Sequence, residues 1–505
     1  MASLLSEKLE KSNLRITQNA GLPSSRTLAT IDQLVVVLPE KPPASVWRKI
    51  PQGNRLQALM RRRTPDSVPA IATRINNKRQ SLVAIGTIAA DAPVHEQLTF
   101  ARKLVNGVLA EKAGCLGVWA LGFRDADARA IVARVIAAAQ AIAFPLADFK
   151  SKQRPARIKS IRIVGLDEKI DLSRVTAEAN GNNLARWLTA MPPNKLDAQV
   201  YVTLLRELSK KQGWQFRKYG VAVLTKLGAG AFLAVAQGNA DDRAAIVHLR
   251  YRPGRKKDDE PALSLVGKGI IFDTGGNNLK PFSSMVDMHI DMGGSAVAVG
   301  TLLAMTELKL PIAVDCWLAI TENRIGPTAY KSQDIIRAIN GKTIQTIHTD
   351  AEGRLALADT LVLACRDNPK LIIDYATLTG ACINAITRYY CGVFTNRPDL
   401  HPVMKKAGQD SGERVWPFPL GKEFISDLES DTADLRQCTP DAAGDHILAA
   451  TFLNEFVSRE IPWIHVDLSA LQRKGGLGHV PTDINGFGVR FTLDLLLDKK
   501  VLEKH

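Results

Sequence analysis

The chain of 505 residues lacks any uninterrupted apolar segment long enough to cross a bilayer. Residues 1–8 (MASLLSEK) contain no apolar run of signal-peptide length, and the acidic Glu7 argues against a transit peptide. The hydrophobic fraction of 46% and the charged fraction of 23% are typical of globular proteins. We therefore expect a soluble, cytoplasmic protein without a membrane partner.

Cysteine pairs are also lacking. The six cysteines are scattered, with no CxxC pair and no zinc-finger spacing. Disulfide frameworks are uncommon in a chain of this size that has no secretion signal. We expect reduced, mostly buried thiols, and a reactive cysteine is the lesser alternative.

Most of the chain lacks an excess of charge of either sign, but its first third is strongly basic. Residues 1–170 hold 27 Lys+Arg and 13 Asp+Glu, a net charge of +14, whereas the whole chain carries +15. A field of this sign attracts nucleic acid, membrane surfaces or acidic partners. The excess is dispersed, and Arg61–Arg63 is its one tight cluster. A solvated basic surface is the simpler interpretation, and DNA binding is the alternative.

The length and the alternation of elements predict a two-domain α/β protein. Short β-branched runs indicate strands, and longer periodic stretches indicate helices. In the first part of the chain we expect strands at 33–38, 81–86 and 161–165 and helices at 97–113 and 126–143. In the second part we expect strands at 233–237, 244–251, 262–267, 311–319, 344–348, 371–375 and 463–467 and helices at 198–212, 294–308, 355–367 and 446–459.

A helix over about 173–190 separates these parts and stops at Pro192-Pro193, because two prolines forbid its continuation. We therefore expect a smaller, basic N-terminal α/β domain over residues 1–170 and a linker helix with its Pro-Pro turn over 171–195. A larger catalytic α/β domain around a central mixed sheet is expected over 196–505.

Three glycine-rich segments combine carboxylates with backbone that a ligand can approach closely. They are residues 266–276 (VGKGIIFDTGG) with Lys280 shortly after, residues 288–294 (MHIDMGG) and residues 348–354 (HTDAEGR). Ligands of open α/β sheets gather beyond the carboxyl ends of strands, where the first and third segments are expected.

Four carboxylates in these segments predict a centre of two divalent metal ions. Buried carboxylates must be paired or bound to cations, and the charges of Asp273, Asp291, Asp350 and Glu352 would neutralise two such ions. Asp350 and Glu352 are two residues apart, so extended backbone would project both from one face. A salt bridge or a turn cap would explain any one carboxylate alone, but not the set. Two bridged cations form a hydrolytic device.

The segments resemble those of the leucine (cytosol) aminopeptidase family, peptidase family M17, and especially its bacterial aminopeptidase A branch. The matching sequence blocks, with matching spacings, are residues 266–281, 291–294, 349–355 and 376–382. The resemblance covers roughly residues 185–495, and residues 1–170 share only the family's general α/β arrangement. It implies a leucyl aminopeptidase-type metallo-exopeptidase that releases N-terminal amino acids from short peptides.

The resemblance implies two metal ions and a ligand set for each. The tighter ion would be held by Lys268, Asp273, Asp291 and Glu352, and the second by Asp273, Asp350 and Glu352. A lysine ligand must be deprotonated, which adjacent cations favour. Carboxylate and amine ligands suit zinc, manganese, cobalt or magnesium, of which we favour zinc or manganese.

The resemblance also implies the residues that bind substrate and move protons. Lys280 would stabilise the oxyanion, and Arg354 would hold a bicarbonate ion that acts as general base. Met288 would line the pocket for the first residue of the substrate. Bicarbonate and substrate would be framed by Thr377, Leu378 and Gly380.

Four residues near the expected site depart from the family's pattern. His289 stands where the family usually has lysine, and His348 where it usually has asparagine. Either could be an extra ligand or a proton shuttle, but a packing or substrate-side contact is favoured because the ligand set is full. Ser469 and Gln472 are expected to face the first-residue pocket and to make it less suited to leucine.

A fifth departure lies at residues 444–447 (GDHI), which replace a Gly-Gly-Ser-type helix start. Asp445 is expected to be the N-cap of the helix that follows. None of the departures touches the metal ligands, Lys280 or Arg354, so an inactive structural relative is disfavoured.

The resemblance further implies a homo-hexamer of two trimers whose active sites face an interior cavity, which would favour short peptides. The competing function is a non-specific DNA-binding regulator that acts through the basic N-terminal domain. The two functions do not exclude one another.

Overall fold

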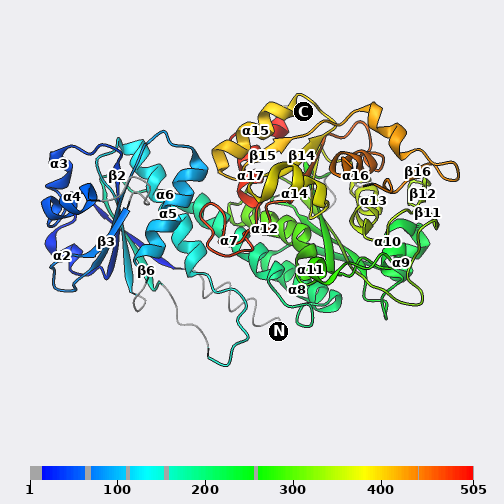
Figure 1. Cartoon of the computed structure of the whole chain (residues 1–505), viewed down its shortest axis with the longest axis horizontal. Coiled ribbons are helices and arrows are strands. Elements are labelled where there is room, and N and C mark those ends of the chain that lie inside the picture. The colour runs from blue at the N-terminus through cyan, green and yellow to red at the C-terminus, as the bar shows by residue number, and fades with distance from the viewer. Residues whose placement is uncertain are drawn as a thin grey trace. The chain divides into compact units, whose positions relative to one another are not determined.

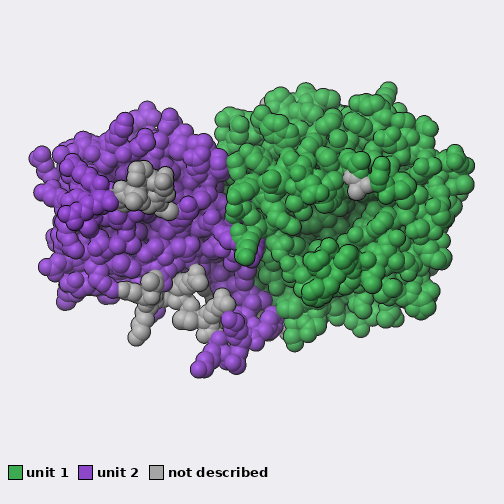
Figure 2. Space-filling view, viewed as in Figure 1, with its two compact units in different colours: residues 1–6, 180–474, 484–505 green, residues 7–179, 475–483 purple. Residues whose placement is uncertain are grey.

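The computed structural model describes residues 14–62, 70–109, 114–152, 158–254, 260–441 and 443–503. The N-terminal residues 1–8 and Arg63 of the basic cluster lie outside these ranges. The chain divides into a large unit, residues 180–474 and 484–505, and a small unit, residues 7–179 and 475–483 (Figure 2). The division falls inside helix α7 (Ser173–Thr189), within the segment expected to be the linker.

The small unit is a six-stranded sheet with helices on both faces (Figure 1). Its strands are parallel except for the edge strand β3. In sheet order they are β1 (Arg15–Ala20), β6 (Ser160–Leu166), β5 (Cys115–Ala120), β2 (Gln33–Pro39), β4 (Leu82–Ile88) and β3 (Ala70–Arg74).

Strand β2 shows why the small unit needs two layers of helices. Val35 and Val37 pack against α5 (Val94–Gly107) and α6 (Asp125–Ala143) on one face of the sheet. Leu34 and Val36 pack on the other face, against α2 (Ser25–Leu28), α3 (Ala44–Trp47) and α4 (Gly53–Arg61). A continuous apolar run therefore produces a strand buried on both faces.

The large unit contains a central mixed sheet, as predicted, and it has eight strands (Figure 1). In sheet order they are β15 (Val415–Pro417), β14 (Cys391–Thr395), β17 (Trp463–Asp467), β13 (Leu371–Ala376), β9 (Leu263–Asp273), β10 (Val314–Asn323), β8 (Ala245–Tyr251) and β7 (Gln215–Gly220). A second, three-stranded sheet contains β11 (Ile335–Arg337), β12 (Thr343–Gln345) and β16 (Leu435–Arg436). The central strands β13, β9 and β10 are parallel, so their carboxyl ends lie at one edge.

Helices cover both faces of the eight-stranded sheet. One face packs against α10 (Gly230–Ala236), α13 (Glu352–Cys365) and α16 (Asp445–Asn454). The opposite face packs against α8 (Ala198–Gln212), α12 (Gly293–Glu307) and α17 (Val489–Leu497). The remaining helices of this unit are α9 (Val221–Leu227), α11 (Phe282–Met285), α14 (Gly380–Ile386), α15 (Leu400–Ser411), η1 (Met288–Met292), η2 (Thr387–Tyr389), η3 (Lys422–Leu428) and η4 (Val501–Glu503).

Two expectations that came from missing features can be compared with the structure. All six cysteines are free thiols, and four of them are buried. Among the described residues one helical stretch, Met288–Glu307, has the length and apolarity of a membrane span, and 89% of its apolar window is buried inside the fold. It is the core helix α12 with its preceding turn.

Glycine allows α12 to lie unusually close to the central strands. A Cβ atom at Gly267 of β9 would lie 2.4 Å from Cα of Ser295, and one at Gly294 would lie 2.1 Å from the carbonyl oxygen of Tyr375. Both distances are far shorter than any side chain tolerates, so only glycine fits at these contacts. This approach fixes the turn before α12 beside the middle of β9.

Three expectations about local structure were wrong. Residues 233–237 belong to helix α10 rather than to a strand, because a short apolar run flanked by glycine does not distinguish a buried helix from a strand. Asp350 lies in a turn and Glu352 begins α13, so the two do not share one face of an extended strand. Strands β1, β3, β5, β7, β11, β14, β15 and β16 were not predicted.

We expect Gly267→Ala to destabilise the large unit, because its methyl group has no space between β9 and α12. Overpacking of this kind costs about 1–3 kcal/mol or more of unfolding free energy. Gly220→Ala is the matched control, since its Cβ would lie 3.7 Å from the nearest atom, and it should cost less than about 1 kcal/mol. Urea unfolding followed by circular dichroism measures both, and equal midpoints would contradict the close-approach argument.

Candidate metal centre and active site

Strand β9 supplies two charged residues from the interior of the large unit. Lys268 lies in the middle of the strand with 3% of its surface exposed, and Asp273 is its last residue. Space for the Lys268 side chain exists because Gly353 of α13 has no Cβ, which would lie 2.5 Å from the lysine Nζ. Lys268 of β9 thus reaches the start of α13, which lies within the third glycine-rich segment.

The loop after β9 returns Lys280 to Asp273. Gly275 and Gly276 adopt positive φ angles of 86° and 63°, which favour glycine. The loop is closed by a hydrogen bond of 3.0 Å from the backbone N–H of Lys280 to the carbonyl of Thr274. The Lys280 ammonium then lies 2.9 Å from Oδ2 of Asp273 and also contacts Oδ1 of Asp350.

Asp291 enters the site from η1, directly before α12. The Thr377 hydroxyl donates to its Oδ1 at 2.7 Å, and Lys268 Nζ lies 2.9 Å from its Oδ2. The same ammonium lies 2.8 Å from Oε1 of Glu352 and donates to the Thr377 carbonyl at 3.0 Å. Lys268 therefore joins three segments that are far apart in sequence.

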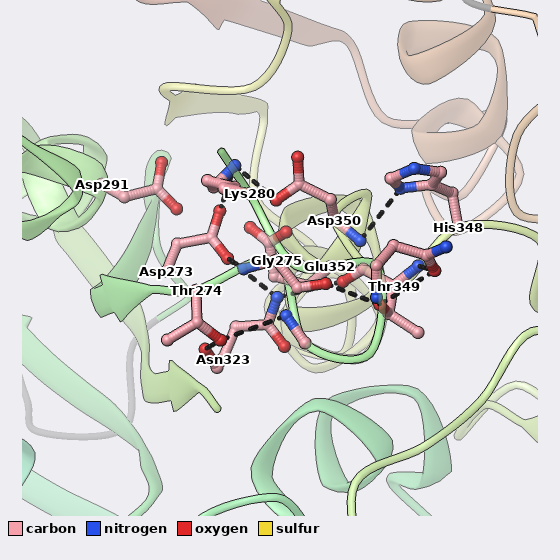
Figure 3. Close-up of polar contacts among 12 residues, drawn as sticks. Asp273, Thr274, Gly275, Lys280, Asp291, Asn323, His348, Thr349, Asp350 and Glu352 are labelled. Atoms are coloured by element: carbon pink, nitrogen blue, oxygen red, sulfur yellow. Dashed lines mark hydrogen bonds and ion pairs between the residues drawn. The ribbon is translucent and has the colours of Figure 1, made fainter. Parts of the chain in front are cut away.

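The carboxylates of Asp273, Asp350 and Glu352 converge beside Lys280 (Figure 3), with one oxygen of each within 4.8 Å of the others. Buried oxygens of Asp291, Asp350 and Glu352 have only the Lys268 and Lys280 ammonium groups as partners, and the second oxygen of Glu352, Oε2, is buried with no hydrogen-bond partner. Oxygen atoms in this state fit divalent metal ions, which require several carboxylate ligands. The residues present therefore match a metal centre.

The pKa values of these groups reflect an excess of negative charge. Burial raises the pKa of Asp350, and the neighbouring Asp273 and Glu352 raise it further, to about 7. Burial also raises the pKa of Asp291 well above its usual range. Burial would lower the pKa of Lys268, but the carboxylates of Asp291, Glu352 and Asp273 raise it above its ordinary value. In the absence of metal the two lysines supply the positive charge that this cluster requires.

Asn323 is a supporting residue that the sequence analysis missed. It ends β10 beside Asp273, as the strand register requires, and its amide donates to Asp273 Oδ1 at 2.8 Å and to the Thr349 carbonyl at 3.0 Å (Figure 3). It thereby ties β9 to the turn that carries Asp350. It lies outside the three glycine-rich segments, so only its position at the end of a strand could have indicated it.

The charged cluster opens into a cavity of about 630 Å³. Ten of the eleven predicted site residues line it, and Glu352 lies behind them; the ten are Lys268, Asp273, Lys280, Met288, Asp291, Asp350, Arg354, Thr377, Leu378 and Gly380. His348, Ser469 and Gln472 also contribute to the lining, whereas His289 does not. Neither His289 nor His348 belongs to the cluster of possible metal ligands formed by Asp273, Asp350 and Glu352. Nδ1 of His348 instead accepts a hydrogen bond of 3.2 Å from the backbone N–H of Asp350.

Arg354 already holds an anion supplied by the chain. Its Nη2 donates to both carboxylate oxygens of Asp445, at 2.7 and 2.8 Å. The expectation that Asp445 is an N-cap was wrong, because the N-cap is Gly444 and Asp445 is the first residue of α16. A bicarbonate ion on this edge of Arg354 would meet a carboxylate, so the residues present do not fit it.

The catalytic-domain model of the cytosol aminopeptidase family matches residues 183–493. The chain belongs to this family. A probable cytosol aminopeptidase from Synechococcus sp. (strain CC9605) is 33% identical over 434 residues, which cover 85% of this chain and 88% of the relative. Membership confirms the prediction of an enzyme of the aminopeptidase class.

Solved structures of similar proteins share the family fold. The bottromycin maturation enzyme BotP, in complex with Mn, matches with a TM-score of 0.78 and 28% identity over 93% of this chain and 99% of its own. Leucyl aminopeptidase from Trypanosoma brucei, in complex with bestatin, matches with a TM-score of 0.83 and 23% identity over 100% of this chain and 99% of its own. The predicted two-domain α/β class agrees with these cytosol aminopeptidase family structures.

We expect Glu352→Gln to weaken metal binding by more than about tenfold, because the amide removes a charge from the centre of the cluster. Glu322→Gln is the matched control, since that carboxylate pairs with Arg324 outside the cavity. Metal content after dialysis against zinc or manganese, together with titration calorimetry, measures the difference. Equal metal content in both variants would argue against a metal centre at Glu352.

Proposed function

We propose that the protein is a two-metal aminopeptidase that removes N-terminal amino acids from short peptides. The observation that carries the proposal is the convergence of Asp273, Asp350 and Glu352, with Lys268 and Asp291 at their side, at the wall of one cavity. Family membership gives the reaction class, and the arrangement of the side chains supports these residues as its machinery.

In this proposal the ligands of one ion are Lys268, Asp273, Asp291 and Glu352, and those of the second are Asp273, Asp350 and Glu352. Zinc and manganese are the favoured ions. When bound, two such ions polarise a carbonyl oxygen and lower the pKa of water. Lys268 has to lose its proton to become a ligand, and its contacts with Asp291 and Glu352 would then be replaced by contacts to metal.

Lys280 keeps its proton and stabilises the oxyanion. Burial alone would lower its pKa, but Asp273, Glu352 and Asp350 raise it above its ordinary value. Its two carboxylate contacts fix the ammonium at the wall of the cavity. A fixed positive charge of this kind stabilises negative charge that develops on the scissile carbonyl.

The proposed substrate site occupies the rest of the cavity. Thr377, Leu378 and Gly380 lie along the start of α14 and place backbone groups at its wall. Met288 faces the same space as Ser469 and Gln472, whose hydroxyl and amide make the pocket less apolar. We infer a preference broader than leucine alone.

Three further parts of the proposal follow from the resemblance. The first is a homo-hexamer of two trimers, which would restrict access to short peptides. The second is a cytoplasmic location. The third, bicarbonate as general base, is disfavoured because the Arg354 guanidinium already donates to both carboxylate oxygens of Asp445.

The net charge of +14 in residues 1–170 supports a second candidate function, non-specific DNA binding. Such binding would depend on phosphate contacts from dispersed lysines and arginines. It would accompany the peptidase activity and weaken steeply with salt.

The principal proposal predicts metal-dependent hydrolysis of leucine-, methionine- and arginine-p-nitroanilide. Metal-stripped protein should be inactive and should recover with zinc or manganese. Lys280→Ala should lower kcat about 10²–10³-fold, because it removes the oxyanion's charged partner. Lys331→Ala, at a lysine whose side chain is 70% exposed, should keep full activity. Absence of hydrolysis with every metal and every substrate would overturn the proposal.

DNA binding predicts a mobility shift of duplex DNA at low salt that disappears at physiological salt. Replacing the exposed Arg61 and Arg62 by glutamate should weaken the shift, whereas the same replacement at the exposed Lys210 and Lys226 of the large unit should not. Absence of a shift at low salt would remove this function.

A further inference from the structure

The cavity contains an ion pair, Arg354 with Asp445, in which neither residue is a proposed metal ligand. Arg354 is buried, with 1% of its surface exposed. Its Nη2 donates to both oxygens of Asp445, and its Nη1 donates to the Gln437 carbonyl at 3.1 Å. The carboxylate therefore takes the Nη2 group that a two-point contact with an external anion would need, while the neighbouring Nε is buried with no hydrogen-bond partner.

The local backbone holds Asp445 in this position. Gly444 has a φ angle of 66°, in the left-handed region that favours glycine, and α16 begins with the next residue. A carboxylate in the first turn of a helix interacts favourably with the helix dipole. Asp445 is thus fixed by the start of α16 as well as by Arg354.

Asp445 is also part of the cavity that contains the metal cluster. It lines the same cavity as Asp273, Lys280 and Asp350, and 21% of its side chain is exposed there, against 1% for Arg354. A single nitrogen of Arg354 serves both carboxylate oxygens, so each oxygen keeps a lone pair. The carboxylate can therefore accept a proton without leaving its partner.

We propose that Asp445 is the enzyme's own general base, in the place where the family resemblance implies bicarbonate, so that hydrolysis requires no bicarbonate. The inference rests on the proposed aminopeptidase function. A water molecule loses its proton to the Asp445 carboxylate as the water oxygen bonds to the scissile carbonyl carbon. The proton then passes from Asp445 to the leaving nitrogen as the C–N bond breaks. Water is the only co-reactant.

The test compares zinc-loaded enzyme in buffer depleted of carbon dioxide with the same enzyme in millimolar bicarbonate. The wild-type rate should be the same in both, and titration calorimetry should detect no binding of bicarbonate. Asp445→Ser vacates the edge of Arg354, so it should be slowed about 10²–10⁴-fold without bicarbonate. Added bicarbonate should bind to this variant and restore much of the rate.

Two further variants separate the general base from a structural role. Asp445→Asn keeps an oxygen for Arg354 but loses the base, so it should fold, be slow and stay slow with bicarbonate. Asp427→Ser removes an exposed carboxylate outside the cavity and should behave as the wild type. If Asp445→Ser does not fold, the Asp445→Asn rate decides: full activity overturns the proposal and slow turnover supports it.

Stimulation of the wild type by bicarbonate, with binding detected by calorimetry, would overturn the inference while the aminopeptidase function stands. Wild-type rates in both Asp445 variants would do the same. A wild type that is inactive with every metal would instead sink the peptidase function. Calorimetry would then still report whether Asp445 excludes bicarbonate from Arg354.

Discussion

Repulsion among four carboxylates, three of them buried, is the constraint around which the large unit is built. Asp273, Asp291, Asp350 and Glu352 are held close together, which is unfavourable unless cations accompany them. Two lysine ammonium groups offset part of this charge, and the excess that remains would favour the binding of divalent ions. The high pKa of Asp350 is a sign of the same imbalance.

This cluster depends on close contacts between the central strands and their helices. Gly267 and Gly294 bring α12 against β9, and Gly353 leaves room for the Lys268 side chain. The same glycines that allow dense packing therefore also set the positions of Lys268 and Asp291. Stability and site geometry are linked here, because a methyl group at Gly267 or Gly294 would displace backbone, and one at Gly353 would displace the Lys268 side chain itself.

The cavity contains a second charge system at α13 and α16. Glu352 and Arg354 are two residues apart on α13, and the first belongs to the metal cluster while the second pairs with Asp445. One helix start thus positions both a proposed metal ligand and the partner of the proposed carboxylate base. A replacement at the start of α16 would alter the charge of the cavity without touching any proposed metal ligand.

The sequence by itself determined the composition of the site and the class of fold. Glycine-rich blocks with acidic residues indicated the four carboxylates Asp273, Asp291, Asp350 and Glu352, and the family resemblance supplied the other seven expected site residues; all eleven gather around the cluster and its cavity. Longer periodic helices such as α8 were predicted correctly, since amphipathic periodicity is a local property.

Tertiary structure decided the remainder. Residues 233–237 have an apolar sequence that is compatible with either a strand or a helix. They are helical because α10 packs against α13. Asn323 and Asp445 obtained their partners from strand register and from a distant helix, and contacts between residues far apart in the chain leave no mark in a local sequence pattern.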